Sequence, residues 1–162
     1  MNMLITRNSV LYLLFFFTVV LMAGFVLWTP SVGGVGLDGI SSVAEIESLL
    51  AGMSESEKDS HFWMTLLLDM LFPLAYGGLF AGICLKHAGR YARYLVLPAL
   101  VVIPVDMLEN IIQLLALKDN VSFLELKALL TPTKFFLFYV AAAIASASLL
   151  ISIVTKGFSI KP

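Results

Sequence analysis

Four long apolar runs alternate with short polar segments along the chain, and each run is long enough to cross a bilayer as a helix. The predicted spans cover residues 10–28, 61–85, 94–117 and 132–155. Helical spacing of apolar residues predicts two further short helices, at 42–52 and 122–130. Ser42 with Glu45 has the spacing of a capping box at the start of the first. We therefore expect an all-α integral membrane protein, a four-transmembrane-helix bundle with two short interfacial helices on the non-cytoplasmic side.

Proline marks two special positions within this pattern. Pro73 lies inside the second span, where it removes a backbone N–H, so we expect a kink and a neighbouring helix that satisfies the freed carbonyl. Thr131 and Pro132 have the residue types of an N-cap and a first helical position, which predicts that the fourth span begins there. Ser54 with Glu57 forms another capping box just ahead of the second span.

Composition supports a membrane protein with a single domain. Of the 162 residues, 60% are hydrophobic and 13% are charged, and the mean hydropathy is +0.97. Soluble domains have roughly 45–50% apolar and about 25% charged residues. The one cysteine, Cys84, cannot form an internal disulfide and is expected to be a buried apolar residue. No basic patch with interleaved aromatic residues suggests nucleic-acid binding, and we expect no cofactor.

Charge is distributed unevenly between the two ends of the predicted bundle. Four spans place both termini and the turn between the second and third spans on one side. This side carries six basic and no acidic residues: Arg7, Lys86, Arg90, Arg93, Lys156 and Lys161. The opposite side carries four lysines and eight acidic residues: Asp38, Glu45, Glu47, Glu55, Glu57, Asp59, Asp119 and Glu125. The positive-inside rule predicts that both termini are cytoplasmic.

Polar residues in the second and third spans follow helical spacing and form one stripe on each helix. The stripe of the third span consists of Asp106, Glu109, Asn110 and Gln113. The stripe of the second span consists of His61, Thr65, Asp69, Pro73 and Tyr76. Asp69 and Glu109 both lie roughly 12 Å from the outer ends of their helices, at 1.5 Å per residue. The two stripes meet if these helices pack together.

The sequence therefore predicts an acidic ligand pocket within the membrane. Three carboxylates in a medium of low dielectric constant repel one another, so some must be protonated or share a cation. Lys134 is the nearest base, and we expect it to snorkel outward. The two surface helices lie over the outer end, so the pocket should open on that side. The predicted ligand-binding residues are Asp69, Tyr76, Asp106, Glu109, Asn110 and Gln113.

A metal is not expected in this pocket. His61 together with the three carboxylates has suitable donor atoms for a divalent ion, but the spacings typical of metal-binding helices are missing. His61 is also expected to lie exposed at the membrane interface. A structural alternative stays open, in which the third-span stripe is only a hydrogen-bonded network between helices. Asp69 also has a structural alternative, in which its protonated side chain donates a hydrogen bond to a carbonyl freed by Pro73.

Three functions remain open. The first is binding or carriage of a lipid-like or cationic small molecule. The second is an intramembrane acid–base enzyme that isomerises or cyclises an isoprenoid or sterol-like substrate, with Asp69, Asp106 and Glu109 as candidate catalytic residues. This architecture is similar to that of sterol isomerases of the emopamil-binding type, a resemblance of fold that implies acid–base chemistry. The Asp106-x-x-Glu109-Asn110 pattern resembles small bacterial membrane proteins, which implies the bacterial inner membrane.

The third function is that of a non-catalytic subunit or assembly factor. Gly78 and Gly82 have the small-xxx-small spacing that lets helices approach closely, and Ala143 and Ala147 lie in a run of small residues in the fourth span. These four residues are predicted to pack helices together, within the chain, against a membrane-protein partner, or in a homo-oligomer.

Overall fold

The computed structural model of the protein describes residues 4–158, with side chains up to Thr155. Every regular element in this part of the chain is a helix. The long helices are α1 (Asn8–Trp28), α3 (Glu55–Met64), α4 (Phe72–His87), α6 (Leu97–Ala116) and α7 (Leu124–Phe158). Four stretches are long and apolar enough to cross a membrane: Asn8–Val32, Glu55–His87, Gly89–Ala116 and Leu124–Thr155. The prediction of an all-helical chain with four such helices is confirmed.

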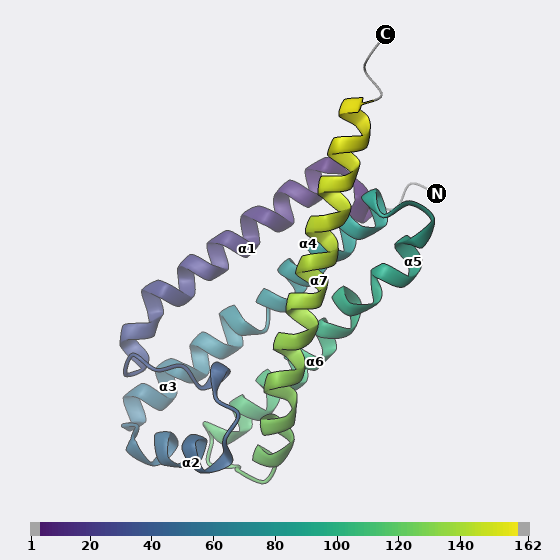
Figure 1. Ribbon diagram of the computed structural model, residues 1–162. Helices are drawn as coiled ribbons and strands as arrows, with labels where there is room; N and C mark the ends of the chain where they lie inside the picture. Colours follow the sequence, from purple (N-terminus) through teal and green to yellow (C-terminus); the bar gives the residue numbers. More distant parts are fainter. Residues whose placement is uncertain (1–3, 159–162) are drawn as a thin grey trace.

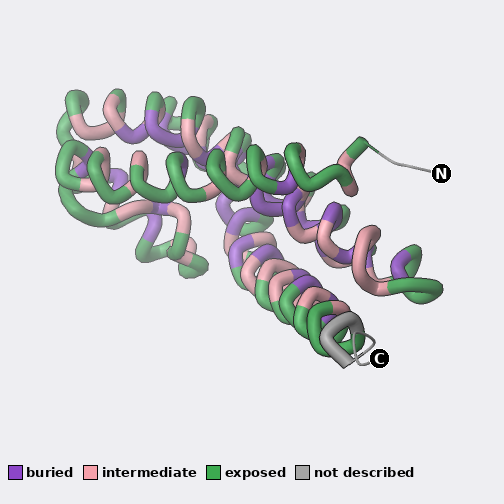
Figure 2. The backbone as a smooth tube through the Cα atoms, turned by 90° about the horizontal axis from the view of Figure 1, so that it is seen from above, coloured by how far each residue is buried: buried purple, intermediate pink, exposed green. Residues whose placement is uncertain are grey.

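The long helices run side by side, and both ends of the described chain lie at the same end of the bundle (Figure 1). α4 is central, since it packs against α1, α6 and α7. α1 contributes only two buried residues, Leu11 and Leu21, and is otherwise exposed or half-buried. Figure 2 shows that buried positions gather on the sides of the helices that face the interior of the bundle. The short helices η5 (Gly89–Tyr91) and α5 (Ala92–Leu95) make the turn from α4 to α6.

The opposite end of the bundle is covered by residues 29–53, which we call the cap segment (Figure 1). It contains two 3₁₀ turns, η2 (Thr29–Val32) and η3 (Leu37–Gly39), and the helix α2 (Val43–Gly52). Its side chains Leu37, Ile46 and Leu50 pack with Ala116, Leu117 and Leu124 from the ends of α6 and α7. α2 lies where the sequence predicts a short helix, although the Ser42 side chain makes no capping hydrogen bond there.

The second apolar stretch is interrupted ahead of Pro73, as the sequence predicts. α3 begins with the predicted capping box between Ser54 and Glu57. It passes into a π-helical turn, η4 (Thr65–Asp69), and α4 starts afresh at Phe72. The wider turn adjusts the backbone where proline cannot donate its hydrogen bond.

α7 differs from the prediction, because it is one continuous helix from Leu124 onward. The short helix expected at 122–130 forms its first turns, and no break occurs at Thr131 or Pro132. Because α7 is continuous across this region, residues on both sides of the predicted break share one helical register. At spacings of four and three residues, Lys127, Thr131 and Lys134 lie on one face of a single helix.

The two glycines predicted to pack helices have unequal surroundings. A Cβ atom on Gly82 would lie 2.6 Å from Leu11 Cδ2 and 2.7 Å from the backbone oxygen of Ile5. A Cβ on Gly78 would make an ordinary contact of 3.4 Å with Leu14. The close approach of α4 to Leu11 of α1, and to Ile5 just ahead of α1, therefore requires glycine at position 82 but not at position 78.

The small residues of α7 divide between two faces. Ala141 and Ala145 are buried, and they pack with Ala81 of α4 and Ala99 of α6. The two alanines singled out from the sequence, Ala143 and Ala147, lie on the exposed face. Their packing role therefore stays a prediction about a partner outside this chain.

Candidate ligand-binding site

The two polar stripes are both buried, and they face each other across the α3–η4–α4 and α6 helices. The buried members are His61, Thr65, Asp69, Pro73 and Tyr76 on one side, and Asp106, Glu109, Asn110 and Gln113 on the other. Gln113 Nε2 donates a hydrogen bond of 2.8 Å to Thr65 Oγ1. Tyr76 Oη donates one of 2.7 Å to Asp106 Oδ2. Helical periodicity thus located both faces correctly.

Asn110 satisfies the backbone carbonyl that Pro73 leaves free. In a regular helix the N–H of residue 73 would donate to the carbonyl of Asp69, and proline has no N–H. Asn110 Nδ2 donates to this carbonyl at 2.9 Å instead. A side chain of α6 thereby completes the backbone hydrogen bonding of the broken helix, as predicted for the kink.

Lys127 lies fully buried beside Glu109. Its ammonium group is 2.7 Å from Glu109 Oε1, and the Thr131 hydroxyl donates to the same oxygen at 2.6 Å. The ammonium also donates to the backbone oxygens of Leu37 and Ile40, at 3.0 and 3.3 Å. Lys127 therefore ties the cap segment, α6 and α7 together.

Lys134 is the second buried base, with 4% of its surface exposed. It forms ion pairs with Asp38, Asp106 and Glu109, and the contact to Asp106 measures 3.5 Å. The expectation that Lys134 snorkels outward is wrong, and Lys127 is another base inside the bundle. The i, i+4, i+7 spacing of Lys127, Thr131 and Lys134 was the signal for this face. It was hidden by the predicted helix break.

Asp38, Asp106, Glu109, Lys127 and Lys134 together form what we call the ionic cluster. One oxygen each of Asp38, Asp106 and Glu109 lie within 4.8 Å of one another, close enough to hold a metal ion. The ammonium group of Lys134 contacts all three carboxylates. It supplies the positive charge that this oxygen set requires.

His61 is buried, although its position near the end of the span predicted exposure. Its Nε2 atom accepts a hydrogen bond of 3.1 Å from the backbone N–H of Leu37. The cap segment folds back over the end of α3 and encloses the ring. The two residues are 24 positions apart in the sequence, so no local pattern predicts this contact.

A small cavity of about 100 Å³ lies next to the ionic cluster. Its acidic wall is formed by Asp38, Asp69 and Asp106, and Lys134 also lines it. The other lining residues are aromatic: Phe72, Tyr76, Phe135, Phe138 and Tyr139. Asp69 is only 5% exposed, and its buried Oδ2 atom has no hydrogen-bond partner among the described residues. No base lies within ion-pairing distance of Asp69 in the described part of the chain. Asp69 is thus a buried carboxyl group that faces a cavity and forms no ion pair among the described residues.

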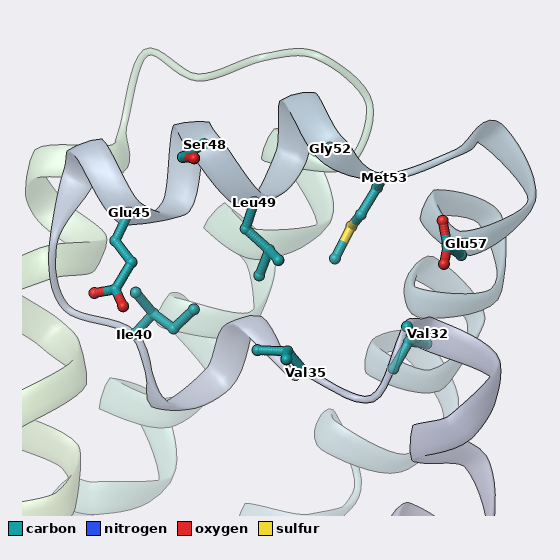
Figure 3. Close-up of a pocket in the computed structure, with 10 residues that line it drawn as sticks. Val32, Val35, Ile40, Glu45, Ser48, Leu49, Gly52, Met53 and Glu57 are labelled. Carbon is teal, nitrogen blue, oxygen red and sulfur yellow. The ribbon is translucent and has the colours of Figure 1, made fainter.

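A separate, more open pocket of about 470 Å³ lies under α2 (Figure 3). It is lined mainly by apolar residues of the cap segment, among them Val32, Ile40 and Leu49. Glu57 at its edge is already engaged in the capping box of α3. None of the predicted ligand-binding residues lines this pocket.

The predicted ligand-binding residues separate into two groups. Asp69, Tyr76 and Asp106 line the cavity. Glu109, Asn110 and Gln113 are buried and contact Lys127, the Asp69 carbonyl and Thr65. No family model, curated protein or solved structure matches this chain.

Proposed function

We propose that the protein spans a membrane four times, with both termini in the cytoplasm, and binds the cationic group of a small amphipathic molecule beside Asp69. The observation that carries this proposal is the buried Asp69 carboxyl group, which lines a cavity. Its Oδ2 atom accepts no hydrogen bond, and the group forms no ion pair, among the described residues. An unpaired carboxylate in a medium of low dielectric constant is costly, and a bound cation removes that cost.

The balance of charges supports a further cation. The ionic cluster and Asp69 together contain four carboxyl groups and two ammonium groups. Counted as ionised, they leave an excess of two negative charges. Lys134 already serves three of the carboxylates, so Asp69 is where an added positive charge meets the least competition.

Cavity size limits the bound part of the ligand to a head group. Pockets for drug-sized molecules measure roughly 300–1,000 Å³, whereas this cavity measures about 100 Å³. Tyr139 on its rim is 66% exposed on the outer face of α7. An apolar tail therefore leaves the cavity past Tyr139 and lies in the lipid, which suits an amphipathic molecule.

The test uses isothermal titration calorimetry to measure the binding of two small cations, choline and ethanolammonium, to the protein in mild detergent. We expect at least one of them to bind the wild type and not Asp69→Asn. This variant breaks no ion pair among the described residues, because Asp69 forms none there. Variants of Asp106 or Glu109 are less suitable, since breaking a buried ion pair costs about 3–5 kcal/mol.

Asp59→Asn is the matched control for this titration. It makes the same change of charge at an exposed residue, which among the described residues forms one ion pair, with Lys118 on the surface. It should bind as the wild type does. Failure of both cations to bind the wild type, or equal binding to Asp69→Asn, would overturn the proposal.

Acid–base catalysis is the second candidate, and one observation favours it. Asp69 and Asp106 line the same cavity in unlike surroundings. Asp106 accepts from Tyr76 and pairs with Lys134, whereas Asp69 Oδ2 has no hydrogen-bond partner among the described residues. Two carboxyl groups held in different environments are suited to separate acid and base roles. Turnover of an isoprenoid or sterol-like substrate, lost in Asp69→Asn, would distinguish an enzyme from a binder.

A further inference from the structure

We propose that the cationic group bound beside Asp69 is a trimethylammonium head. This inference rests on the function proposed above and names the chemical class of its ligand. Three features of the cavity lead to it: its volume, the arrangement of its rings and its supply of hydrogen-bond acceptors.

Volume is the first feature. A cavity of about 150 Å³ holds benzene, so one of about 100 Å³ holds roughly four non-hydrogen atoms. A trimethylammonium group consists of one nitrogen and three methyl carbons. The head of such a ligand therefore fills the cavity, and its substituent continues past the rim.

The aromatic walls are the second feature. Tyr76 lies edge-to-face with Phe72, at a centroid distance of 5.1 Å and an interplanar angle of 65°. Tyr76 and Phe138 are 5.0 Å apart at 80°. All three of these rings line the cavity, together with Phe135 and Tyr139. Aromatic enclosures of this kind bind quaternary ammonium groups through the negative faces of the rings.

A cation already lies over one ring of the cavity. The Lys134 ammonium is 5.2 Å from the centroid of the Phe135 ring. Lys134 forms its ion pairs with Asp38, Asp106 and Glu109, and Asp69 is not among these partners.

The supply of acceptors is the third feature, and it disfavours a primary ammonium group. Such a group has three N–H donors, each of which needs an acceptor once it leaves water. Of the acidic side chains that line the cavity, Asp106 already accepts from Tyr76 and Lys134, and Asp38 accepts from Lys134. Asp69 is left to serve the ligand. A trimethylammonium group has no N–H, so one carboxylate as counter-ion is sufficient.

The experiment compares three probes that share a two-carbon alcohol: choline, ethanolammonium and dimethylbutanol, the uncharged carbon isostere of choline. We expect choline to bind at least about tenfold more tightly than ethanolammonium, as cation–π contacts from several rings provide. Dimethylbutanol should not bind measurably. Choline binding should disappear in Asp69→Asn.

Ring variants test the aromatic contribution. Tyr139→Leu removes a ring from the exposed rim and should weaken choline binding by about threefold to tenfold. Phe136→Leu is its control, because Phe136 is equally exposed on α7 and does not line the cavity. Phe138→Leu removes an inner ring and should cost at least as much as Tyr139→Leu.

The outcomes separate this inference from the proposed function. If ethanolammonium binds as tightly as choline or more tightly, and binding requires Asp69, cation binding stands and the trimethylammonium assignment is overturned. Unchanged choline affinity in both Tyr139→Leu and Phe138→Leu also overturns the assignment. If neither cation binds, both proposals fall.

A final arm identifies the source of the head group. Trimethylammonium groups occur on lipid head groups and on small soluble molecules. Choline titrations are therefore repeated in two sets of nanodiscs with the same fraction of phosphatidylglycerol, and so the same surface charge, whose remaining lipid is phosphatidylethanolamine or phosphatidylcholine. Weaker choline binding in phosphatidylcholine identifies a competing lipid head group, and equal binding in both identifies a soluble ligand.

Discussion

At the scale of single residues, Asn110 and Pro73 act as a matched pair on neighbouring helices. The Asn110 amide donates to the Asp69 carbonyl, which is free only because residue 73 has no N–H. A buried carbonyl without a donor costs about 1–3 kcal/mol, and more where no water reaches it.

This pairing predicts a non-additive pair of substitutions. Asn110→Leu alone should lower the free energy of unfolding by about 1–3 kcal/mol, measured by equilibrium unfolding in mixed micelles. In a Pro73→Ala background the new N–H of residue 73 is able to take the Asp69 carbonyl, so Asn110→Leu should cost clearly less. Equal costs in the two backgrounds would contradict the pairing.

Lysine is the residue type for which sequence reasoning failed, and the reason is physical. A lysine in an apolar stretch near a helix end normally reaches back to water with its long side chain. Lys127 and Lys134 remain buried because carboxylates of α6 and the cap segment compensate the lost hydration. These partners lie 18 or more residues away along the chain, so local patterns do not reveal them.

At the scale of helices, the contact between α1 and α4 depends on Gly82. A methyl group there would collide with Leu11 and with the Ile5 backbone, whereas one at Gly78 would make a normal contact with Leu14. Because a backbone atom cannot move aside as a side chain does, the two positions should respond differently.

We therefore predict that Gly82→Ala destabilises the α1–α4 contact and that Gly78→Ala does not. The loss should be about 1–3 kcal/mol for Gly82→Ala, as for other substitutions that overpack a tight contact. Thermal unfolding in detergent, or crosslinking between cysteines placed on α1 and α4, measures the difference. Equal effects of the two substitutions would show that the contact is looser than described.

The exposed face of α7 carries the remaining alternative, a role as subunit or assembly factor. Ala143 and Ala147 lie four residues apart on this face and present small side chains to the surroundings. Such spacing suits close packing against another helix in a membrane. This face lies apart from the buried pair Ala141 and Ala145, so partner binding and the internal core use different residues.

At the scale of the whole molecule, the two ends of the bundle differ in charge and in covering. Exposed basic residues such as Arg90 lie at the end of the bundle where both ends of the described chain lie, and the cap segment with exposed Glu45 covers the other end (Figure 1). The proposed orientation places the basic end in the cytoplasm.

Cysteine labelling in intact cells tests this orientation. In a Cys84→Ala background, Glu45→Cys should react with a maleimide that does not cross membranes. Arg90→Cys should react only after the cells are permeabilised. The reverse pattern would invert the orientation, and labelling of both positions from outside would contradict a membrane-spanning bundle.

The amino-acid sequence by itself determined the number of long apolar helices, the break ahead of Pro73 and the two faces on which the polar residues lie. These features depend on the period of the helix and on the missing N–H of proline, both of which are local. The tertiary structure alone decided the pairing of Lys127 and Lys134 with carboxylates, the burial of His61 under the cap segment and the isolation of Asp69 beside an aromatic cavity. Each of these depends on contacts between segments far apart in the chain. Burial there raises the free-energy cost of a charge, and the position of an oppositely charged partner decides whether that cost is compensated.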